Sequence, residues 1–323
     1  MDHRQLLDCL SCEAAISGSV LAARLGVTRA AVWKQVEVLR ALGAPIEAAA
    51  GRGYRLAWPI EWLDAGRIRD ALEPPLRQRA SAIEVLWQVD STSSELLRRA
   101  GNDARDLRVC IAETQSAGRG RRGRHWQSPL GGNLYFSLLK RFDSGMAGLT
   151  GLSLAAGTAV IAALADCGVS DIGLKWPNDV LARGRKLAGV LIELGGEFLG
   201  PCHAVVGVGI NLRLPETAAN AIDQPAIDLA TLGGAAVSRN RLAARLLANL
   251  IETLDRFAAR GFAAVADDYA RADLLRGKAV RVLAPSGTND GVADGVDARG
   301  ALRVRHGERI ALYDSAEVSV RMP

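Results

Sequence analysis

Residues 115–126 have the sequence QSAGRGRRGRHW, in which three glycines are interspersed with four arginines. Glycine lets the backbone wrap closely around a ligand, and each arginine presents a planar fork of positive charge that suits carboxylates and phosphates. Because so many like charges repel one another in the empty protein, we expect this segment to be mobile until an anion orders it. The stretch therefore predicts a loop that binds a phosphate-bearing ligand.

The same segment contains the spacing G-x-G-x-x-G, which is also found in dinucleotide-binding proteins. That fingerprint requires its last glycine to open a helix whose N-terminus meets the pyrophosphate. Here residues 126–132 read WQSPLGG, which cannot form a helix. We therefore expect a strand at residues 134–139 instead, and no nicotinamide chemistry.

The chain on both sides of this loop alternates between strand-like and helix-like patterns. Residues 109–112 and 134–139 are apolar runs of strand length, and residues 147–167 and 240–260 have helical periodicity. This alternation predicts a mixed α/β domain over residues 70–272. Beyond it, short apolar runs at 278–284, 291–297, 301–305 and 309–313 are separated by glycine turns, which predicts a small SH3-like β-barrel over residues 275–323.

A second stretch with chemical potential lies at residues 175–193, which begins KWPND and continues to RGRKLAGVLIE. The pattern predicts a strand, a turn forced by Pro177, a short strand, a turn at Gly184 and a strand from Lys186. A lysine at the mouth of such a hairpin is placed to meet negative charge that develops at phosphorus. The alternative is a solvated lysine on a turn.

The N-terminal residues 1–60 have the rhythm of a winged helix-turn-helix. Val20, Leu21 and Leu25 are expected on the apolar side of one helix, Gly26 gives a turn, and Thr28 is a good N-cap for the next helix. The hairpin that should follow ends in the sequence GRGYR at residues 51–55, which is typical of a wing.

In the second helix of this unit, the apolar stripe leaves several side chains facing solvent. Ala30, Trp33 and Lys34 could therefore enter a DNA major groove, with Arg29 near phosphates at the leading end and Arg52 reaching from the wing. A protein-docking module is the alternative, because residues 1–58 contain seven Lys and Arg against five acids. With so few phosphates to neutralise, we expect weak DNA binding by a single copy.

Composition limits the remaining possibilities. The 323 residues are 49% hydrophobic and 23% charged, which is typical of a soluble globular protein with two or three units. We expect a cytoplasmic protein without a membrane span, because the N-terminus lacks an export signal and the five cysteines make no disulfide framework. Cys9 and Cys12 have the spacing of half a zinc site, but only His3 lies nearby, so we expect no metal site in the protein itself.

Four motifs in fixed order resemble the bacterial biotin protein ligases. They are residues 118–124 with Trp126, residues 175–179, residues 186–189 and the sequence GVGIN at residues 207–211. Together with the helix-turn-helix ahead and the small barrel behind, the similarity covers nearly the whole chain. It resembles the bifunctional type, which also represses biotin synthesis genes.

The resemblance implies a set of residues that bind biotin and its adenylate, among which Lys186 and Arg119 contact the reacting groups. The set is Ser91, Thr92, Ser93, Gln115, Arg119, Gly120, Arg121, Trp126, Lys175, Asn178, Lys186 and Asn211. The family usually has Ser-Thr-Asn where this chain has Ser91-Thr92-Ser93. A serine has a shorter reach than an amide and offers fewer hydrogen bonds, so the binding role of Ser93 is the one most in question.

The resemblance also implies substrates and partners. ATP with Mg²⁺ would activate biotin as biotinyl-5′-adenylate, and a lysine of a biotin carboxyl carrier protein would accept the biotin. The adenylate would promote a homodimer that binds operator DNA. Two alternatives stay open from the residues alone: a non-catalytic transcription factor that senses a small acid, and a lipoate ligase with the same catalytic fold.

Overall fold

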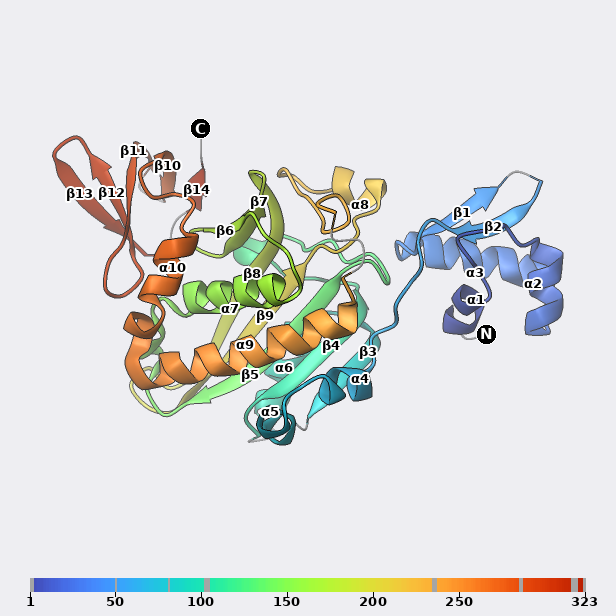
Figure 1. Ribbon diagram of the computed structural model, residues 1–323, viewed down its shortest axis with the longest axis horizontal. Coiled ribbons are helices and arrows are strands. Elements are labelled where there is room, and N and C mark those ends of the chain that lie inside the picture. Colours follow the sequence, from blue (N-terminus) through green and yellow to red (C-terminus); the bar gives the residue numbers. More distant parts are fainter. Residues whose placement is uncertain are drawn as a thin grey trace.

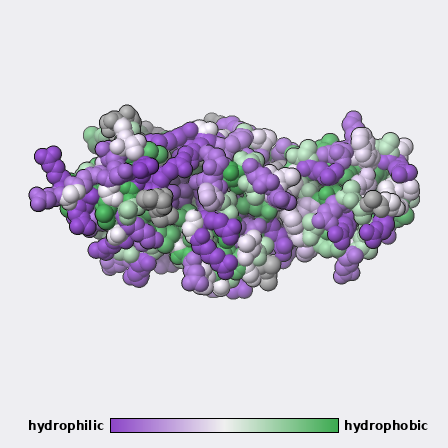
Figure 2. All heavy atoms as spheres, turned by 90° about the horizontal axis from the view of Figure 1, so that it is seen from above, coloured by the Kyte–Doolittle hydropathy of each residue, from purple (hydrophilic) through white to green (hydrophobic). Residues whose placement is uncertain are grey.

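The computed structural model of the protein describes residues 3–49, 51–80, 82–101, 105–233, 237–284, 287–314 and 319–321. Helices with a hairpin form one end of the molecule, a large sheet with helices forms the middle, and a smaller sheet forms the other end (Figure 1). Hydrophilic residues cover most of the face seen in Figure 2, with apolar residues showing between them. No described helix is both long and apolar enough to span a bilayer.

The N-terminal unit is a helix-turn-helix followed by a hairpin, as predicted. Its elements are α1 (His3–Asp8), α2 (Gly18–Leu25), α3 (Arg29–Ala41), β1 (Ile46–Ala49) and β2 (Gly53–Leu56). Gly26 ends α2 with a φ of 66°, a left-handed conformation that glycine adopts without strain. The Thr28 hydroxyl then caps α3 by accepting a hydrogen bond from the Ala31 N–H at 3.1 Å.

The core of this unit confirms most of the predicted apolar stripe. Leu21 of α2 and Val32 and Val36 of α3 are fully buried. The expectation for Val20 was wrong, because its side chain is 44% exposed. Helix α2 packs through Leu21 and Ala22, which turns the neighbouring Val20 outward.

The middle of the molecule is a seven-stranded mixed sheet with the order β3-β4-β5-β9-β8-β7-β6. Only β3 and β4 run parallel, and every other neighbouring pair is antiparallel. The strands are β3 (Ile83–Val89), β4 (Arg108–Gln115), β5 (Leu134–Phe142), β6 (Ile172–Lys175), β7 (Asp179–Ala182), β8 (Arg185–Gly196) and β9 (Cys202–Ile210). The predicted hairpins around Pro177 and Gly184 are confirmed.

The two faces of this sheet bury different apolar clusters. Val109 and Ile111 of β4 join the large core with α7 (Leu152–Asp166) and α9 (Arg239–Arg260). The intervening Cys110 points to the other face, into a small cluster with Leu96 of α6 (Thr92–Ala100). Because successive strand residues alternate between faces, the near-continuous apolar runs of the sequence correspond to strands covered on both sides.

The helix expected over residues 147–167 is shorter than predicted. Gly151 has a φ of 84°, which breaks the helical path, so α7 begins only at Leu152. Residues before it form the 3-10 turn η2 (Met146–Leu149). The remaining helices are α4 (Ala65–Asp70), α5 (Pro74–Arg79), α8 (Glu216–Asn220) and α10 (Ala266–Ala272), with 3-10 turns η1 (Arg121–Gly123) and η3 (Gly261–Ala264).

The C-terminal end is a five-stranded antiparallel sheet with the order β13-β12-β11-β10-β14. Its strands are β10 (Ala279–Ala284), β11 (Gly287–Val296), β12 (Leu302–His306), β13 (Arg309–Tyr313) and β14 (Ser319–Arg321). Within the described residues, no ladder joins the edge strands β13 and β14, so the sheet is open and the closed barrel stays a prediction. The Trp176 indole N–H donates to the Gly300 carbonyl at 3.1 Å and ties this sheet to the middle of the molecule.

One residue of the central unit belongs to the core of the N-terminal unit. Leu130 is fully buried in that core, and its N–H donates to the Leu42 carbonyl at 2.9 Å just beyond α3. The adjacent Gly43 lies so close to Pro129 that a Cβ on it would be 2.7 Å from the proline Cβ. The segment that follows the arginine-rich loop is therefore packed into the helix-turn-helix unit.

Candidate functional site

A cavity of about 370 Å³ lies over the seven-stranded sheet, bounded by the start of α6, by strands β5, β8, β9 and β14, and by the loops between them. All twelve residues that the sequence predicts for ligand binding line it. They come from segments up to 120 positions apart, from Ser91 to Asn211. The structure thus brings the predicted set together around one cavity.

The first side of the cavity is built from hydroxyl groups. The Thr92 Oγ1 and Ser93 Oγ atoms lie 2.8 and 3.0 Å from the Ser137 Oγ. The Thr92 N–H donates to the Gln115 Oε1 at 2.9 Å. Ser93, which stands where the family usually has Asn, is thus engaged with Ser137 and only 5% exposed. Ser137 is a residue that sequence reasoning missed.

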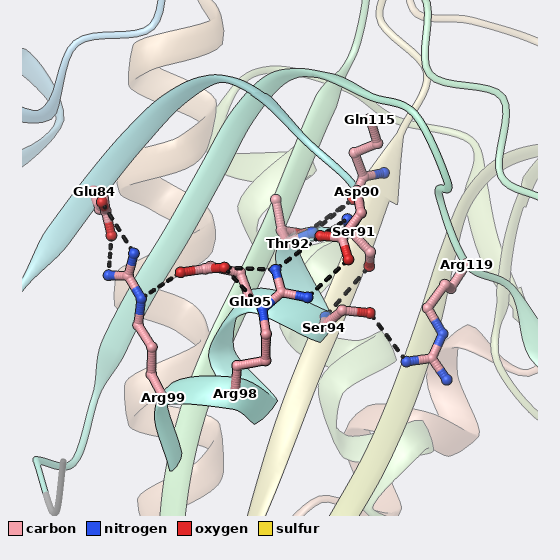
Figure 3. Close-up of polar contacts among 10 residues, drawn as sticks. All are labelled: Glu84, Asp90, Ser91, Thr92, Ser94, Glu95, Arg98, Arg99, Gln115 and Arg119. Carbon is pink, nitrogen blue, oxygen red and sulfur yellow. Dashed lines mark hydrogen bonds and ion pairs between the residues drawn. The ribbon is translucent and has the colours of Figure 1, made fainter. Parts of the chain in front are cut away.

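Ion pairs fix the helix that carries these hydroxyls (Figure 3). Arg98 of α6 donates to both oxygens of Asp90 at 2.7 and 2.9 Å, which lowers the pKa of that carboxyl to about 2. Arg98 and Arg99 also donate to Glu95, at 2.6 Å in each case. The Ser91 hydroxyl caps the helix by accepting from the Ser94 N–H at 3.4 Å. The start of α6 is therefore held to the end of β3.

The second side of the cavity is residues 118–126, called the arginine loop below. The Trp126 indole lies against strand β9, where a Cβ on Gly209 would be 2.4 Å from its ring. This close approach explains why a glycine occupies position 209 of the GVGIN motif. The Trp126 Nε1 is buried without an acceptor among the described residues, which leaves one donor for a ligand.

The side chains of the arginine loop differ in their surroundings. The Arg121 Nη1 donates to the Asn178 Oδ1 at 3.2 Å, and burial lowers the pKa of its guanidinium. Arg119, which lines the cavity, pairs with Glu193 at 2.7 Å. Arg122 and Arg124 are exposed. Arg119 and Arg121 are thus each held by a protein partner beside the cavity.

The third side, called the lysine wall below, consists of Lys175, Asn178, Asp179 and Lys186. The Lys186 Nζ lies 2.7 Å from the Asp179 Oδ1 and 5.4 Å from the centroid of the Trp126 ring. Burial lowers the pKa of Lys175, and the nearby cation Lys186 lowers it further while Asp179 opposes the shift. The sequence alone left open whether Lys186 is a solvated lysine on a turn. In the structure its side chain is largely buried and lines the cavity.

The amides of this side hold the backbone rather than one another. The Asn178 Nδ2 donates to the Val190 carbonyl at 2.8 Å, and the Asn211 Nδ2 donates to the Ile227 carbonyl at 3.2 Å. A parallel bridge between Lys186 and Ala226 brings the segment 221–226 to the cavity. Asn211 thus lines the site mainly as a support for that segment.

The charge of the cavity favours an anion. Seven Lys and Arg side chains line it, against the two carboxylates Asp179 and Asp223. Such an excess suits a ligand that carries a carboxylate or several phosphates. Within the described ranges, no three His, Cys, Asp or Glu side chains gather in a way that could hold a metal ion.

Sequence reasoning missed the contribution of the C-terminal sheet to this cavity. Val320 and Arg321 of β14 line it, next to Lys175. Nothing in the local pattern of the three-residue strand β14 distinguishes it from an ordinary chain end. Only the pairing of β14 with β10 carries Arg321 to the site.

The side chains predicted to read DNA are all exposed in the structure. Arg29, Ala30 and Lys34 are exposed on α3, and Trp33 is 60% exposed. Arg52 is exposed at the turn between β1 and β2. Their exposure leaves them accessible to a partner, and their role in reading DNA stays a prediction.

Comparisons with known proteins agree with these observations. Residues 86–211 match the biotin/lipoate A/B protein ligase family, and residues 3–55 match a helix-turn-helix domain. The bifunctional ligase/repressor BirA of Salmonella typhimurium is 36% identical over 305 residues, which cover 94% of this chain and 93% of that protein. The biotin–[acetyl-CoA-carboxylase] ligase of Mycobacterium tuberculosis is 38% identical over 77% of this chain and 97% of its own length.

Solved structures give the same assignment for the catalytic part. The biotin protein ligase from Aquifex aeolicus in complex with biotin and ATP superposes with a TM-score of 0.63 at 29% identity. The match covers 75% of this chain and 99% of that protein. With both the helix-turn-helix and the ligase region matched in one relative, the chain belongs to the bifunctional ligase/repressor BirA family of biotin protein ligases.

Proposed function

We propose that the protein is an ATP-dependent biotin protein ligase that forms biotinyl-5′-adenylate and transfers biotin to a lysine of a biotin carboxyl carrier protein. The observation that carries the proposal is the convergence of the arginine loop, the lysine wall and the hydroxyls of α6 on one cavity. This arrangement offers neutral polar partners at one end and positive charge at the other. It suits a small acid whose carboxylate meets a nucleotide.

In the first step, the biotin carboxylate attacks the α-phosphorus of ATP, and pyrophosphate leaves. The hydroxyls of Ser91, Thr92 and Ser93 with the Gln115 amide bind the ring system and tail of biotin. Lys186, with its Nζ held 2.7 Å from Asp179, contacts the carboxylate and the α-phosphate and stabilises the negative charge that grows there. Lys175 and Asn178 support the nucleotide, and Asn211 lines the site.

Bound together with ATP, Mg²⁺ would neutralise the negative charge of the phosphates. Mg²⁺ is usually held by one or two carboxylates together with substrate phosphates and water. Asp179 is a suitable carboxylate, because it lines the cavity beside Lys186.

In the second step, the acceptor lysine attacks the carbonyl of the mixed anhydride, and AMP leaves. Arg119, Gly120 and Arg121 close over the carboxylate and phosphates, and Trp126 covers the adenylate. A closed loop keeps water from the anhydride until the acceptor arrives.

The direct test mixes the purified protein with biotin, Mg-ATP and a carrier domain. We expect the mass of one biotinyl group on one lysine of the carrier, together with AMP and pyrophosphate. Reactions without biotin, and reactions with lipoate in its place, are the controls. If lipoate modified the carrier at the same rate, the protein would be a lipoate ligase rather than a biotin-specific enzyme. If neither acid modified the carrier, the proposed ligase activity would be wrong.

We further propose that the protein represses transcription when adenylate is bound, as a homodimer that presents two winged helices to operator DNA. The exposed face of α3 with Trp33 and Lys34, and the wing with Arg52, supply the contacts. Equilibrium sedimentation should show tighter self-association with biotin and ATP than without them. Equal self-association under both conditions would contradict the switch.

The proposed organisation is a winged helix at residues 1–60, a catalytic domain at 70–272 and a C-terminal unit of SH3-like type at 275–323. All five cysteines are free thiols in the structure, which suits the reducing cytoplasm in which we propose the protein to act.

A further inference from the structure

Two protein partners hold the Arg119 side chain. Its Nη2 lies 2.7 Å from the Glu193 Oε1 on strand β8, and its Nη1 donates to the Ser94 Oγ on α6 at 3.3 Å. The contact with Ser94 crosses from the loop to the helix in Figure 3. The guanidinium therefore bridges two elements that flank the cavity.

Glu193 lies behind this arginine rather than inside the cavity. Its side chain is 15% exposed, and it is not one of the residues that line the cavity. Burial raises the pKa of its carboxyl, while the charge and the hydrogen bond of Arg119 oppose that shift. A buried carboxylate needs a cation or donors to stay charged, so each member of the pair fixes the other.

The pair leaves Arg119 able to bind a ligand. A guanidinium has five N–H donors in a fixed plane, and Glu193 and Ser94 are each contacted by one terminal nitrogen. The remaining donors can meet a carboxylate or phosphate that enters the cavity. A side chain that is already ordered loses less conformational freedom when it binds.

We propose that Glu193 and Ser94 are positioning residues, which fix the orientation of the Arg119 guanidinium beside the cavity. The proposal rests on the ligase function proposed above and adds two residues to it. It also explains why the Glu193 carboxylate lies next to a cavity whose positive charge favours anionic ligands.

The sign of the effect distinguishes this proposal from a purely electrostatic role. If Glu193 only reduced the positive potential of the cavity, its removal would tighten the binding of anionic ligands. If Glu193 positions Arg119, removal of the Glu193 carboxylate should instead weaken the binding of anionic ligands. We expect a loss of roughly three- to tenfold, because one side chain becomes disordered.

The test compares Glu193→Leu, Glu193→Gln and Ser94→Ala with the native protein in biotin-dependent pyrophosphate release. We expect Glu193→Leu to raise the KM for biotin roughly three- to tenfold with a smaller change in kcat. Glu193→Gln should retain much of the native KM, because its amide oxygen still accepts from Arg119. Ser94→Ala should raise the KM in the same direction by less. Glu252→Leu, at an exposed glutamate of α9 away from the cavity, is the matched control.

Two further measurements complete the test. In an Arg119→Gln background, Glu193→Leu should have no additional effect, since its partner is gone. In the absence of any ligand, trypsin should cleave the arginine loop faster in Glu193→Leu than in the native protein. An unchanged or lowered KM in Glu193→Leu, or the same effect with and without Arg119, would overturn the proposal. If the native protein released no pyrophosphate, the ligase function would fail, whereas the trypsin rates would still decide the pairing.

Discussion

The lysine wall and the arginine loop carry charge of the same sign, but the protein holds that charge in different ways. In the wall, Lys186 is 15% exposed, is paired with Asp179 and belongs to a strand of the large sheet. In the loop, Arg119 is 45% exposed, and Arg122 and Arg124 are exposed on a segment outside the sheet. From this difference we propose a division of work, in which the wall stabilises the charge that develops in the reaction and the loop captures and retains the ligand.

The largest effect should come from the wall. Lys186→Ala removes a charged contact worth about 1.5 to 3 kcal/mol, so adenylate formation should slow roughly ten- to a hundredfold. Biotin-dependent pyrophosphate release measures this rate, and Arg185→Ala is the control at the neighbouring cation, which does not line the cavity. Unchanged release in Lys186→Ala would remove the wall from the chemistry.

The next effect should come from the loop and appear as loss of the intermediate. Arg121→Gly removes the contact with Asn178 and one guanidinium over the ligand, so the adenylate should dissociate roughly tenfold faster. Activated biotin would then label bystander lysines, which mass spectrometry detects. The control is Arg183→Gly, because Arg183 is exposed, outside the cavity and already at a φ of 49° that glycine tolerates. Labelling confined to the carrier lysine would contradict the retaining role of the loop.

A smaller effect should come from Arg321, which lines the cavity but belongs to neither the lysine wall nor the arginine loop. Arg321 is exposed, so its attraction for phosphates is screened, and Arg321→Ala should weaken ATP binding roughly two- to fivefold. Titration calorimetry with ATP checks this, and Arg309→Ala on the same sheet is the control. Equal affinities in both variants would mean that β14 lines the cavity without contributing to binding.

The smallest effect should appear in the pH dependence of ATP binding. Because the pKa of Lys175 is lowered, this lysine loses its charge at a lower pH than an ordinary lysine does. Affinity for ATP should therefore fall, by about threefold, as the pH rises through that lowered pKa. Lys175→Arg keeps its charge and should abolish the fall. A fall that persists in Lys175→Arg would assign the titration to another group.

Sequence motifs located the site because its main residues lie in segments with strong local signals. The glycines of the arginine loop, the turn at Pro177 and the lysine of the KLAG segment are each visible within a few residues. Arg321 and Glu193 had no such signal, since a lone charge on a strand becomes meaningful only through what the fold packs against it. Spacing along the chain cannot show those contacts.

The fold, like the site, was predictable where the signals are local and unpredictable where packing decides. Alternation and turns predicted the mixed sheet and the hairpin strands, because those patterns arise from local backbone geometry. The start of α7 was placed too early because a left-handed Gly151 interrupts an otherwise helical composition. The sequence places Val20 on the apolar side of its helix because it is one of several apolar residues in a helical pattern, whereas the packing of α2 turns its side chain outward.

The burial of Leu130 in the N-terminal core has a practical consequence for dissecting the protein. A cut near residue 60 would follow the sequence boundary but would strip the cover from Leu130 and from Trp62 and Trp87, which pack against that core. The isolated catalytic fragment would expose an apolar surface that includes Leu130, which follows the arginine loop in the sequence, and this surface would promote self-association. A catalytic fragment without the helix-turn-helix unit should therefore carry polar replacements at Leu130, Trp62 and Trp87.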